Sequence, residues 1–529
     1  MISRVFFGML VTLVAPLQAQ DLVLSPGILS NNITNLAAAG PSIWVGPYLN
    51  VSHDGGETWQ AVNAEPFQDF SNSVYSLAIS GQSIWAGVGN QYTQRDGEGR
   101  LQRINEINGI LHSPDGGDTW NYWLPAPPVD DDPVTTGLLD NPDDSQITYG
   151  TVTLTTLPIT VPAQVAPWDL DFDPGTETLW IAGQLSGLRR SPDLGRTWER
   201  VVLPPDTTSY LGPELGYDFP FTVQPVGIAV SMFHGLNFQA YAVLVDETGT
   251  IWAGTAGGLN RSEDGGTSWY HYTTDHGMLG NWIISIEEQP RGTQPPAIWM
   301  TNWPGRGRGQ GHGIAVTRDQ GVTFQTALHG EECSDFAFDG PRIYVTCERG
   351  LYQSRDDGIT FFFNNEFIDR EDPVRSIRPG ARVYAVEVTD DAVWVSSQDG
   401  LFKSTDQGNS WRIFRAEVPL DPTGLPTIIP EGRVPKVSTY AYPNPFSPST
   451  DRLVRLRYDL DQSQTVTIRI FDFSMTLVRE ISSATGSAGA NEVAWDGTDD
   501  QGVRLANGPY FYAIQAREGT FWGKILIAE

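Results

Sequence analysis

Lysine is almost absent from this sequence. Only Lys403, Lys436 and Lys524 are lysines among 33 basic residues, and 63 acidic residues give the chain a formal net charge of −30. A nucleic-acid backbone or an anionic membrane surface attracts a basic protein face. The charge balance therefore excludes nucleic acid as a partner and disfavours an anionic membrane.

Long apolar runs are also missing beyond the N-terminus. No later segment approaches the roughly 18 apolar residues that a spanning helix needs, so we expect no transmembrane segment. Residues 1–20 combine Arg4, an apolar stretch and the tripeptide LQA, which is typical of an export signal and its cleavage site. We expect a mature protein that is extracellular or on the outer cell surface, with the periplasm as the alternative.

Cysteine occurs only twice, at Cys333 and Cys347. Two ligands do not make a closed zinc shell, and we predict neither a metal nor a cofactor. The two residues are equidistant from Gly340 in a segment that has the pattern of strand, tight turn and strand, so they should face each other. Because export leads to an oxidising compartment, we predict a Cys333–Cys347 disulfide, with two buried free thiols as the alternative.

What the chain does contain is a repeat. A pattern with Ser or Thr, then x-D-x-G-x, then Ser or Thr and a final Trp or Phe occurs seven times, as in SHDGGETW, and each copy follows a short β-rich run with an aromatic residue such as IWAG. Four short strands between turn signals in each unit are typical of propeller blades. The aspartates of the pattern are Asp54, Asp115, Asp193, Asp264, Asp319, Asp356 and Asp406.

These seven aspartates have the features of turn residues. An Asp in a tight turn accepts hydrogen bonds from backbone N–H groups ahead of it, and glycine supplies a positive φ without steric cost. A catalytic group is needed once, not once in every blade. We therefore predict a structural role for the seven aspartates and burial of the preceding aromatic residues between blades.

The repeat resembles the Asp-box, or BNR, repeat. Its family includes sialidases, sortilin-type receptors, xyloglucan-cleaving hydrolases and a photosystem assembly factor. The resemblance implies an all-β fold with a seven-bladed β-propeller over residues 21–418. It does not imply one function, since the box is a device of the fold in all these relatives.

The C-terminal part has a different pattern. Residues 419–435 are proline-rich and predict a semi-rigid linker between independent units. Residues 436–529 alternate polar and apolar residues, which predicts a small Ig-like β-sandwich. The carboxylates Asp496, Asp499 and Asp500 either stabilise a turn or bind calcium.

The C-terminal sequence resembles the Ig-like domain of the flagellar hook-capping protein through YPNPF, WDGTDDQG and NGPYFY. Such modules are also similar to type IX secretion sorting domains. This resemblance implies that export machinery is a partner of residues 436–529, followed by release or surface attachment.

Successive connections between strands alternate between the two faces of a propeller. The Asp-boxes should therefore occupy one face, and almost all long insertions should lie on the opposite face. Insertions on one face mark a binding face, with drift in tolerant loops as the alternative. The aromatic, arginine and histidine residues of these insertions are the predicted ligand-binding candidates: Tyr92, Tyr210, Tyr217, Trp303, Arg306, Arg308 and His312.

Three functions are consistent with the sequence. The first is an exported propeller that binds a glycan or an envelope or extracellular protein. The second is a glycoside hydrolase with two carboxylates in a cleft, and the third is a scaffold or assembly factor. The sialidases that this repeat resembles hold the substrate carboxylate with three arginines, the first in an R-I-P motif of an early blade. A sialidase is disfavoured here, because no arginine occurs in residues 21–94 and the sequence has no R-I-P motif. The sequence nominates no catalytic residue.

Overall fold

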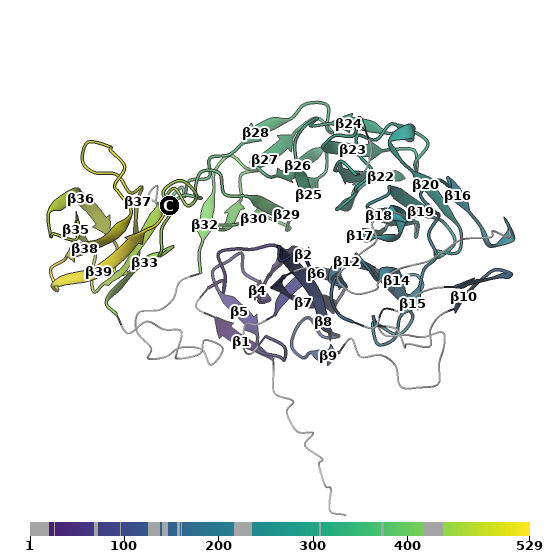
Figure 1. The fold of residues 1–529 in the computed structure, drawn as a ribbon, viewed down its shortest axis with the longest axis horizontal. Coiled ribbons are helices and arrows are strands. Elements are labelled where there is room, and N and C mark those ends of the chain that lie inside the picture. Colours follow the sequence, from purple (N-terminus) through teal and green to yellow (C-terminus); the bar gives the residue numbers. More distant parts are fainter. Residues whose placement is uncertain are drawn as a thin grey trace, which may run out of the picture.

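The computed structural model describes residues 21–25, 27–67, 72–95, 97–124, 138–139, 146–155, 159, 161–215, 235–305, 308–371, 375–416 and 437–529. Residues 1–20, the linker 419–435, Tyr217 and Arg306 lie outside the described residues. The chain is built from antiparallel β-sheets, which confirms the all-β prediction (Figure 1). Short 3-10 turns, η1 (Pro213–Leu215), η2 (Leu236–Phe238) and η3 (Thr274–His276), lie in the connections.

Seven sheets of four or five strands are formed by the described residues before 417. Blade one contains β2 (Leu36–Ala39), β3 (Ser42–Val45), β4 (Asn50–Ser52) and β5 (Trp59–Val62), with β1 (Leu22–Ser25) outside β5. Blade two contains β6 (Ser73–Ser80), β7 (Ser83–Arg95), β8 (Leu101–Ser113) and β9 (Asn121–Trp123). Blade three contains β12 (Pro167–Asp173), β13 (Thr178–Gly183), β14 (Gly187–Ser191) and β15 (Glu199–Arg200), and the hairpin β10 (Gln146–Tyr149) and β11 (Val152–Thr155) precedes it.

The second half of the ring repeats the same order. Blade four contains β17 (Ala240–Val245), β18 (Ile251–Thr255), β19 (Leu259–Ser262) and β20 (Trp269–Tyr272), with β16 (Tyr210–Leu211) outside β20. Blade five contains β21 (Ile286–Arg291), β22 (Gln294–Asn302), β23 (Gly313–Thr317) and β24 (Gln325–Ala327). Blade six contains β25 (Cys333–Asp339), β26 (Arg342–Cys347), β27 (Gly350–Ser354) and β28 (Phe362–Asn364). Blade seven contains β29 (Val383–Val388), β30 (Val393–Ser397), β31 (Gly400–Ser404) and β32 (Arg412–Phe414).

The innermost strands close a ring. Each contacts the innermost strand of the next blade, from β2 through β6, β12, β17, β21, β25 and β29 back to β2. The first and last blades are joined by backbone hydrogen bonds, Ile33 N–H to Ser397 O and Gly400 N–H to Asn31 O. The described innermost strands therefore form a closed ring, as in a propeller (Figure 1), and we use the word channel for the axis that this ring encloses.

The core lies between neighbouring blades. The second strand of each blade carries a large aromatic side chain that is almost fully buried: Trp44, Trp85, Trp180, Trp252, Trp299, Tyr344 and Trp394. The Asp-box glycine of the following blade packs directly on several of these rings, for example Gly117 on Trp44 and Gly266 on Trp180. The prediction that these aromatics are buried between blades is confirmed.

The C-terminal domain is a two-sheet sandwich, as predicted. One sheet contains β33 (Thr439–Tyr442), β34 (Val454–Leu460) and β37 (Gly489–Trp495). The other contains β36 (Leu477–Gly486), β35 (Gln464–Phe471), β38 (Gly508–Gln515) and β39 (Thr520–Ile527). Inward-facing residues of both sheets, including Leu456, Ile468 and Tyr512, form one core.

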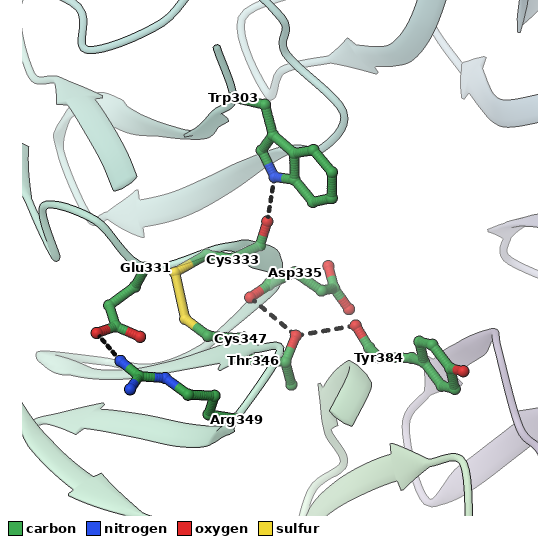
Figure 2. The surroundings of a disulfide bond; sticks show 8 residues. All are labelled: Trp303, Glu331, Cys333, Asp335, Thr346, Cys347, Arg349 and Tyr384. Carbon is green, nitrogen blue, oxygen red and sulfur yellow. Dashed lines mark hydrogen bonds and ion pairs between the residues drawn. A yellow bond between two sulfur atoms is a disulfide. The ribbon is translucent and has the colours of Figure 1, made fainter. Parts of the chain in front are cut away.

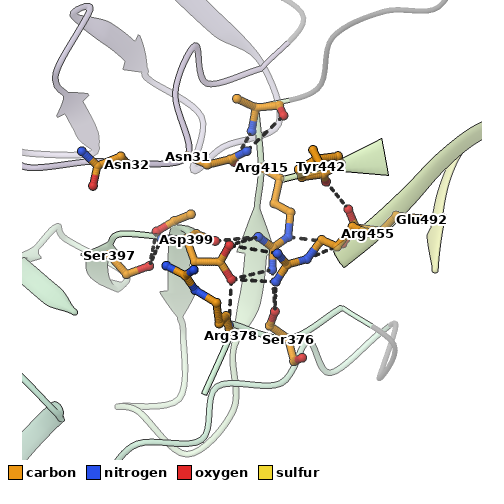
Figure 3. Close-up of polar contacts among 12 residues, drawn as sticks. Asn31, Asn32, Ser376, Arg378, Ser397, Asp399, Arg415, Tyr442, Arg455 and Glu492 are labelled. Carbon is orange, nitrogen blue, oxygen red and sulfur yellow. Dashed lines mark hydrogen bonds and ion pairs between the residues drawn. The ribbon is translucent and has the colours of Figure 1, made fainter. Parts of the chain in front are cut away.

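A buried ionic network joins this sandwich to blade seven (Figure 3). Arg455 and Glu492 of the sandwich meet Asp399 and Arg415 of the propeller, and their side chains are 4%, 6%, 10% and 1% exposed. Each domain supplies one cation and one anion, so every charge finds a partner across the boundary. The proline-rich linker predicts separate units, but the structure places the two domains in contact.

Candidate ligand-binding face

Six aromatic rings follow one another around the mouth of the channel. Their centroids are 5.5 Å apart from Tyr75 to Trp168, 6.2 Å from Trp168 to Tyr241 and 5.3 Å from Tyr241 to Trp282. The series continues over 6.0 Å to Trp303 and 5.4 Å to His312. All six side chains are half-buried, so each leaves part of its ring accessible. We call these six residues of blades two to five the aromatic arc.

The backbone itself directs three members of the arc. Tyr75, Trp168 and Tyr241 lie near the starts of β6, β12 and β17, and at each of them the pairing with the next strand shifts register. A β-bulge of this kind re-aims one side chain out of the regular alternation. Since the innermost strands begin on the face opposite the Asp-boxes, the bulges turn aromatic rings toward that mouth of the channel.

Trp303 is held by blade six. Its indole N–H donates to the backbone carbonyl of Cys333 at 2.9 Å, beside the disulfide between Cys333 and Cys347 (Figure 2). The two cysteines are direct partners in the β25–β26 ladder, and Gly340 in the turn has a φ of 59°. The predicted disulfide is therefore present, and it lies at the same mouth as the arc.

The predicted ligand-binding residues separate into distinct places. Trp303 and His312 belong to the arc, and Arg308 lies in the exposed connection between them. Tyr92 extends from a long β7–β8 hairpin, where the sequence suggests a loop. Tyr210 lies outside this face: it pairs with Tyr270 on the outer edge of blade four, at the strand end that follows an Asp-box.

Carboxylates line the channel beyond the arc. Asp169 and Asp171 accept the backbone N–H groups of Val243 and Val245 in the next blade, at 2.9 and 2.6 Å. Asp335 accepts the N–H of Val386 at 3.0 Å. The inner edge of an innermost strand has backbone N–H groups without a partner strand, and these aspartate side chains accept hydrogen bonds from some of them. The three aspartates thus link blade three to four and blade six to seven.

The channel raises the pKa of these acids. Burial raises the pKa of Asp169 to about 8, and the charges of Asp171 and Asp335 add to the effect of burial. Burial likewise raises the pKa of Asp171 to about 7. The pKa values of Glu287 and Glu387 are also raised, first by burial and then by Asp335. These acids come from the innermost strands β12, β21, β25 and β29, which all belong to the closed ring, so they lie about one axis.

The Asp-box aspartates lie on the opposite face, in the turns between the third and fourth strands. Asp54 accepts hydrogen bonds from Ser52 Oγ at 2.9 Å, Thr58 N–H at 2.9 Å and Thr58 Oγ at 2.6 Å. Burial alone would raise the pKa of Asp54, but the bonds from Thr58 and Ser52 outweigh it and lower the pKa. The other six boxes repeat the same contacts.

Metal binding has no support among the described residues, where no group of three or more His, Cys, Asp or Glu side chains is arranged to hold an ion. Asp496 instead accepts bonds from Thr498, and Asp499 accepts the N–H groups of Gln501 and Val503. Asp500 accepts the N–H of Glu480.

In the part of the chain that the structure covers, no helix is sufficiently long and apolar to cross a bilayer.

Sequence reasoning missed four of the six arc residues, namely Tyr75, Trp168, Tyr241 and Trp282. A signal was present, because VYSL, PWDL and AYAV place an aromatic residue at the same point of three innermost strands. This signal was ambiguous, because an aromatic residue near the start of a strand is equally consistent with a side chain packed in the hydrophobic core. The channel carboxylates were missed because acidic residues are abundant throughout the chain.

Two family models match parts of the chain. The FlgD Ig-like domain matches residues 449–520, and the BNR/Asp-box repeat matches residues 51–61. Both matches agree with the architecture described above. No curated protein matches the chain in sequence.

Several solved structures resemble the chain weakly. PorZ, a surface component of the type-IX secretion system of Porphyromonas gingivalis, is 12% identical with a TM-score of 0.39, over 94% of this chain and 66% of that one. The GH74 enzyme of Niastella koreensis is 13% identical with a TM-score of 0.47, over 97% and 75%. YCF48 from Cyanidioschyzon merolae is 16% identical with a TM-score of 0.41, over 74% and 99%. At this level of similarity the three structures carry no argument about function.

Proposed function

We propose that this protein is an exported β-propeller that binds a glycan chain along the aromatic arc. The observation that carries the proposal is the unbroken series of half-buried rings from Tyr75 to His312, with neighbouring centroids 5.3–6.2 Å apart. Sugar rings stack on aromatic faces, and a ligand site combines apolar walls with a few polar groups.

Polar groups suited to sugar hydroxyls lie beside the arc. The Tyr75 hydroxyl hydrogen-bonds to Asn90 O at 3.1 Å and to Asn105 Oδ1 at 3.2 Å, and Gln91 donates to Asn105 at 2.7 Å. Burial, with the charge of Glu106, raises the pKa of Tyr75 to about 12, so this hydroxyl stays protonated.

An envelope or extracellular protein with an extended segment is the other ligand that fits such a surface.

The C-terminal sandwich directs export or surface attachment in this proposal. Its support is the match to the FlgD Ig-like domain, the disulfide of blade six and the signal-like residues 1–20. A disulfide persists in oxidising compartments. The export machinery is then the partner of residues 436–529.

A glycan array with the purified full chain tests the binding function. Binding of one glycan class should weaken at least about tenfold in Trp168→Ala and in Trp282→Ala, since stacking contacts are lost. Phe362→Ala, an exposed ring on the outer edge of blade six, is the matched control and should bind as the unmodified protein does. Binding that is unaffected by both arc substitutions would place the ligand elsewhere.

A glycoside hydrolase is the second candidate, because carboxylates with raised pKa values converge in the channel. Among the described residues no hydrogen bond to the Glu287 carboxylate contributes to its raised pKa, whereas the carboxylates of Asp169 and Asp171 accept backbone N–H groups. Reducing-sugar release from the glycan that binds, abolished by Glu287→Gln, would support hydrolysis. Binding without any release favours the binding protein.

A further inference from the structure

The C-terminal sandwich contains a surface cavity with a volume of about 390 Å³, which is within the usual range of small-molecule sites. Its walls come from the connection between β33 and β34 and from the connection between β37 and β38. Two of its lining residues are arginines, although the whole chain has a formal charge of −30. We call this cavity the arginine pocket, and its lining residues are Pro448, Ser449, Arg452, Asp496, Thr498 and Arg504.

Close packing at Gly497 brings the two connections together. A Cβ atom at position 497 would lie 2.9 Å from the Phe446 ring and 3.1 Å from Pro448, and the φ of Gly497 is 78°. Glycine adopts this φ without steric cost and leaves room for the neighbouring connection. Thr498 and Arg504 pair across the second connection. The arginine pocket therefore follows from the fold of the sandwich.

Arg452 lies against the propeller. A Cβ atom at Gly380, which precedes β29 of blade seven, would lie 3.5 Å from Arg452 Nη2. The neighbouring Asp451 forms an ion pair with Arg378 at 3.2 Å. Among the described residues Arg452 itself has no ion-pair partner. Its φ of 62° is a left-handed conformation that is unfavourable for a residue with a Cβ atom. Domain docking thus places a cation without a partner at the pocket.

A carboxylate of the chain already contacts two of the lining residues. The Glu529 side chain accepts hydrogen bonds from the Ser449 N–H at 3.1 Å and from the Ser449 hydroxyl, and Arg504 Nη1 lies 3.8 Å from Glu529 Oε1. Guanidinium, hydroxyl and backbone N–H groups are the donors that bind carboxylates. The Arg504 and Glu529 side chains are 65% and 38% exposed, so a carboxylate from solution can compete for the same donors.

The other lining groups indicate hydroxyls beside that carboxylate. Asp496 Oδ1 accepts the Thr498 N–H at 3.1 Å and the Thr498 hydroxyl at 2.7 Å. Within the part of the chain that the structure describes, Asp496 Oδ2 has no hydrogen-bond partner. An ionised carboxylate is an acceptor only, so it accepts a ligand hydroxyl and repels a second anion. Simple oxyanions would leave this acceptor unused.

We propose that the arginine pocket binds a small hydroxy acid. The ligand carboxylate takes the place of the Glu529 side chain on Ser449 and Arg504. Arg452 supplies a second cation to that carboxylate, and a ligand hydroxyl donates to Asp496. A free hydroxy acid and the sugar-acid unit at the end of a saccharide offer the same groups. This site is separate from the aromatic arc, so it does not depend on the proposed glycan binding there.

Calorimetric titration of the full chain with D-galacturonate tests the proposal. Binding should weaken at least about tenfold in Arg452→Gln and in Arg504→Gln, because each variant loses a charge-assisted hydrogen bond to the carboxylate. Arg517→Gln, which replaces an exposed arginine elsewhere on the sandwich, is the matched control and should bind as the unmodified protein does. All three arginines are exposed, so the melting temperature should not change.

Glu529→Ala gives the second measurement. Removal of the competing carboxylate should tighten the binding of D-galacturonate at least about threefold. Galactose, which lacks the carboxylate, and acetate, which lacks the hydroxyls, should each bind at least about tenfold more weakly than D-galacturonate.

Three results would overturn the site: no binding of D-galacturonate, binding that is the same in both arginine variants as in the unmodified protein, or binding that Glu529→Ala does not tighten. Equal affinity for D-galacturonate and its trimer would identify a free hydroxy acid as the ligand. Tighter binding of the trimer that keeps the dependence on Arg452 and Arg504 would identify the end of a saccharide chain.

Discussion

Arg455 of the C-terminal sandwich forms a two-pronged ion pair with Asp399 of blade seven, with Nη2–Oδ2 at 2.6 Å and Nη1–Oδ1 at 3.0 Å. Arg415 pairs with the same carboxylate at 3.1 Å and reaches Glu492 at 3.2 Å. Burial alone would raise the pKa of Asp399, but Arg415 and Arg455 outweigh it and lower the pKa. The two domains therefore share one charge-balanced cluster (Figure 3).

Breaking this cluster on one side should be costly. Asp399→Asn leaves Arg415 and Arg455 to share the buried carboxylate of Glu492, and removal of one partner from a buried pair costs about 3–5 kcal/mol. Urea unfolding should show this loss. The control Arg190→Gln breaks a half-exposed pair with Glu199 and should cost less than about 1 kcal/mol. Equal effects of the two substitutions would contradict the prediction.

Deletion of the whole sandwich should lower the stability of the propeller less than Asp399→Asn does. Without residues 437–529, Asp399 and Arg415 still neutralise each other at 3.1 Å. We expect a propeller that unfolds cooperatively and is retained in the periplasm. Circular dichroism of the purified fragment and immunoblots of cell fractions provide the measurements. Normal arrival of the fragment in the medium would show that the sandwich is not needed for export.

The disulfide should stabilise blade six. Cys333 and Cys347 lie 14 positions apart in the sequence, and in the chain-entropy model a loop of about 15 residues corresponds to about 3 kcal/mol. The double variant Cys333→Ser with Cys347→Ser should lose that free energy of unfolding. Mass spectrometry of the non-reduced exported protein should find no alkylatable thiol, and two alkylated cysteines would refute the bond.

The channel acids should make stability fall as pH rises. Asp169 and Asp171 have folded-state pKa values of about 8 and about 7, above the ordinary value of 3.8. A raised pKa means that the folded protein binds more protons than the unfolded chain, so this contribution is complete below about pH 4 and is lost as pH rises toward about 8. Melting temperature measured from pH 5 to pH 9 should therefore decline.

Asp169→Asn isolates that effect. The amide carries no titratable proton, so the decline of melting temperature with pH should be shallower in the variant. Asp54→Asn is the control, because the pKa of Asp54 is lowered and its contribution is lost only as pH falls through the acid range. An unchanged slope in Asp169→Asn would show that the channel acids are ionised throughout.

Local sequence determined much of the fold. Ser52, Asp54 and Thr58 are close in the chain, so their turn contacts repeat wherever the motif repeats. Cys333 and Cys347 flank one hairpin, and their equal distance from Gly340 fixes them as ladder partners. Short-range geometry is readable in this way because few residues separate the interacting groups.

Only the tertiary structure decided the sites. Tyr75 and Trp303 belong to one arc although 228 positions separate them in the numbering (303 − 75), and ring closure alone brings their blades around one channel. Tyr210 is an aromatic residue in a long insertion, as a ligand-binding residue would be. It nevertheless lies at an outer edge, because β16 adds a fifth strand to blade four. Likewise Arg455 and Asp399 are ordinary charged residues in sequence. Their pairing follows from the docking of two folded domains, which no local pattern encodes, since burial and long-range contact arise from packing and not from residue type.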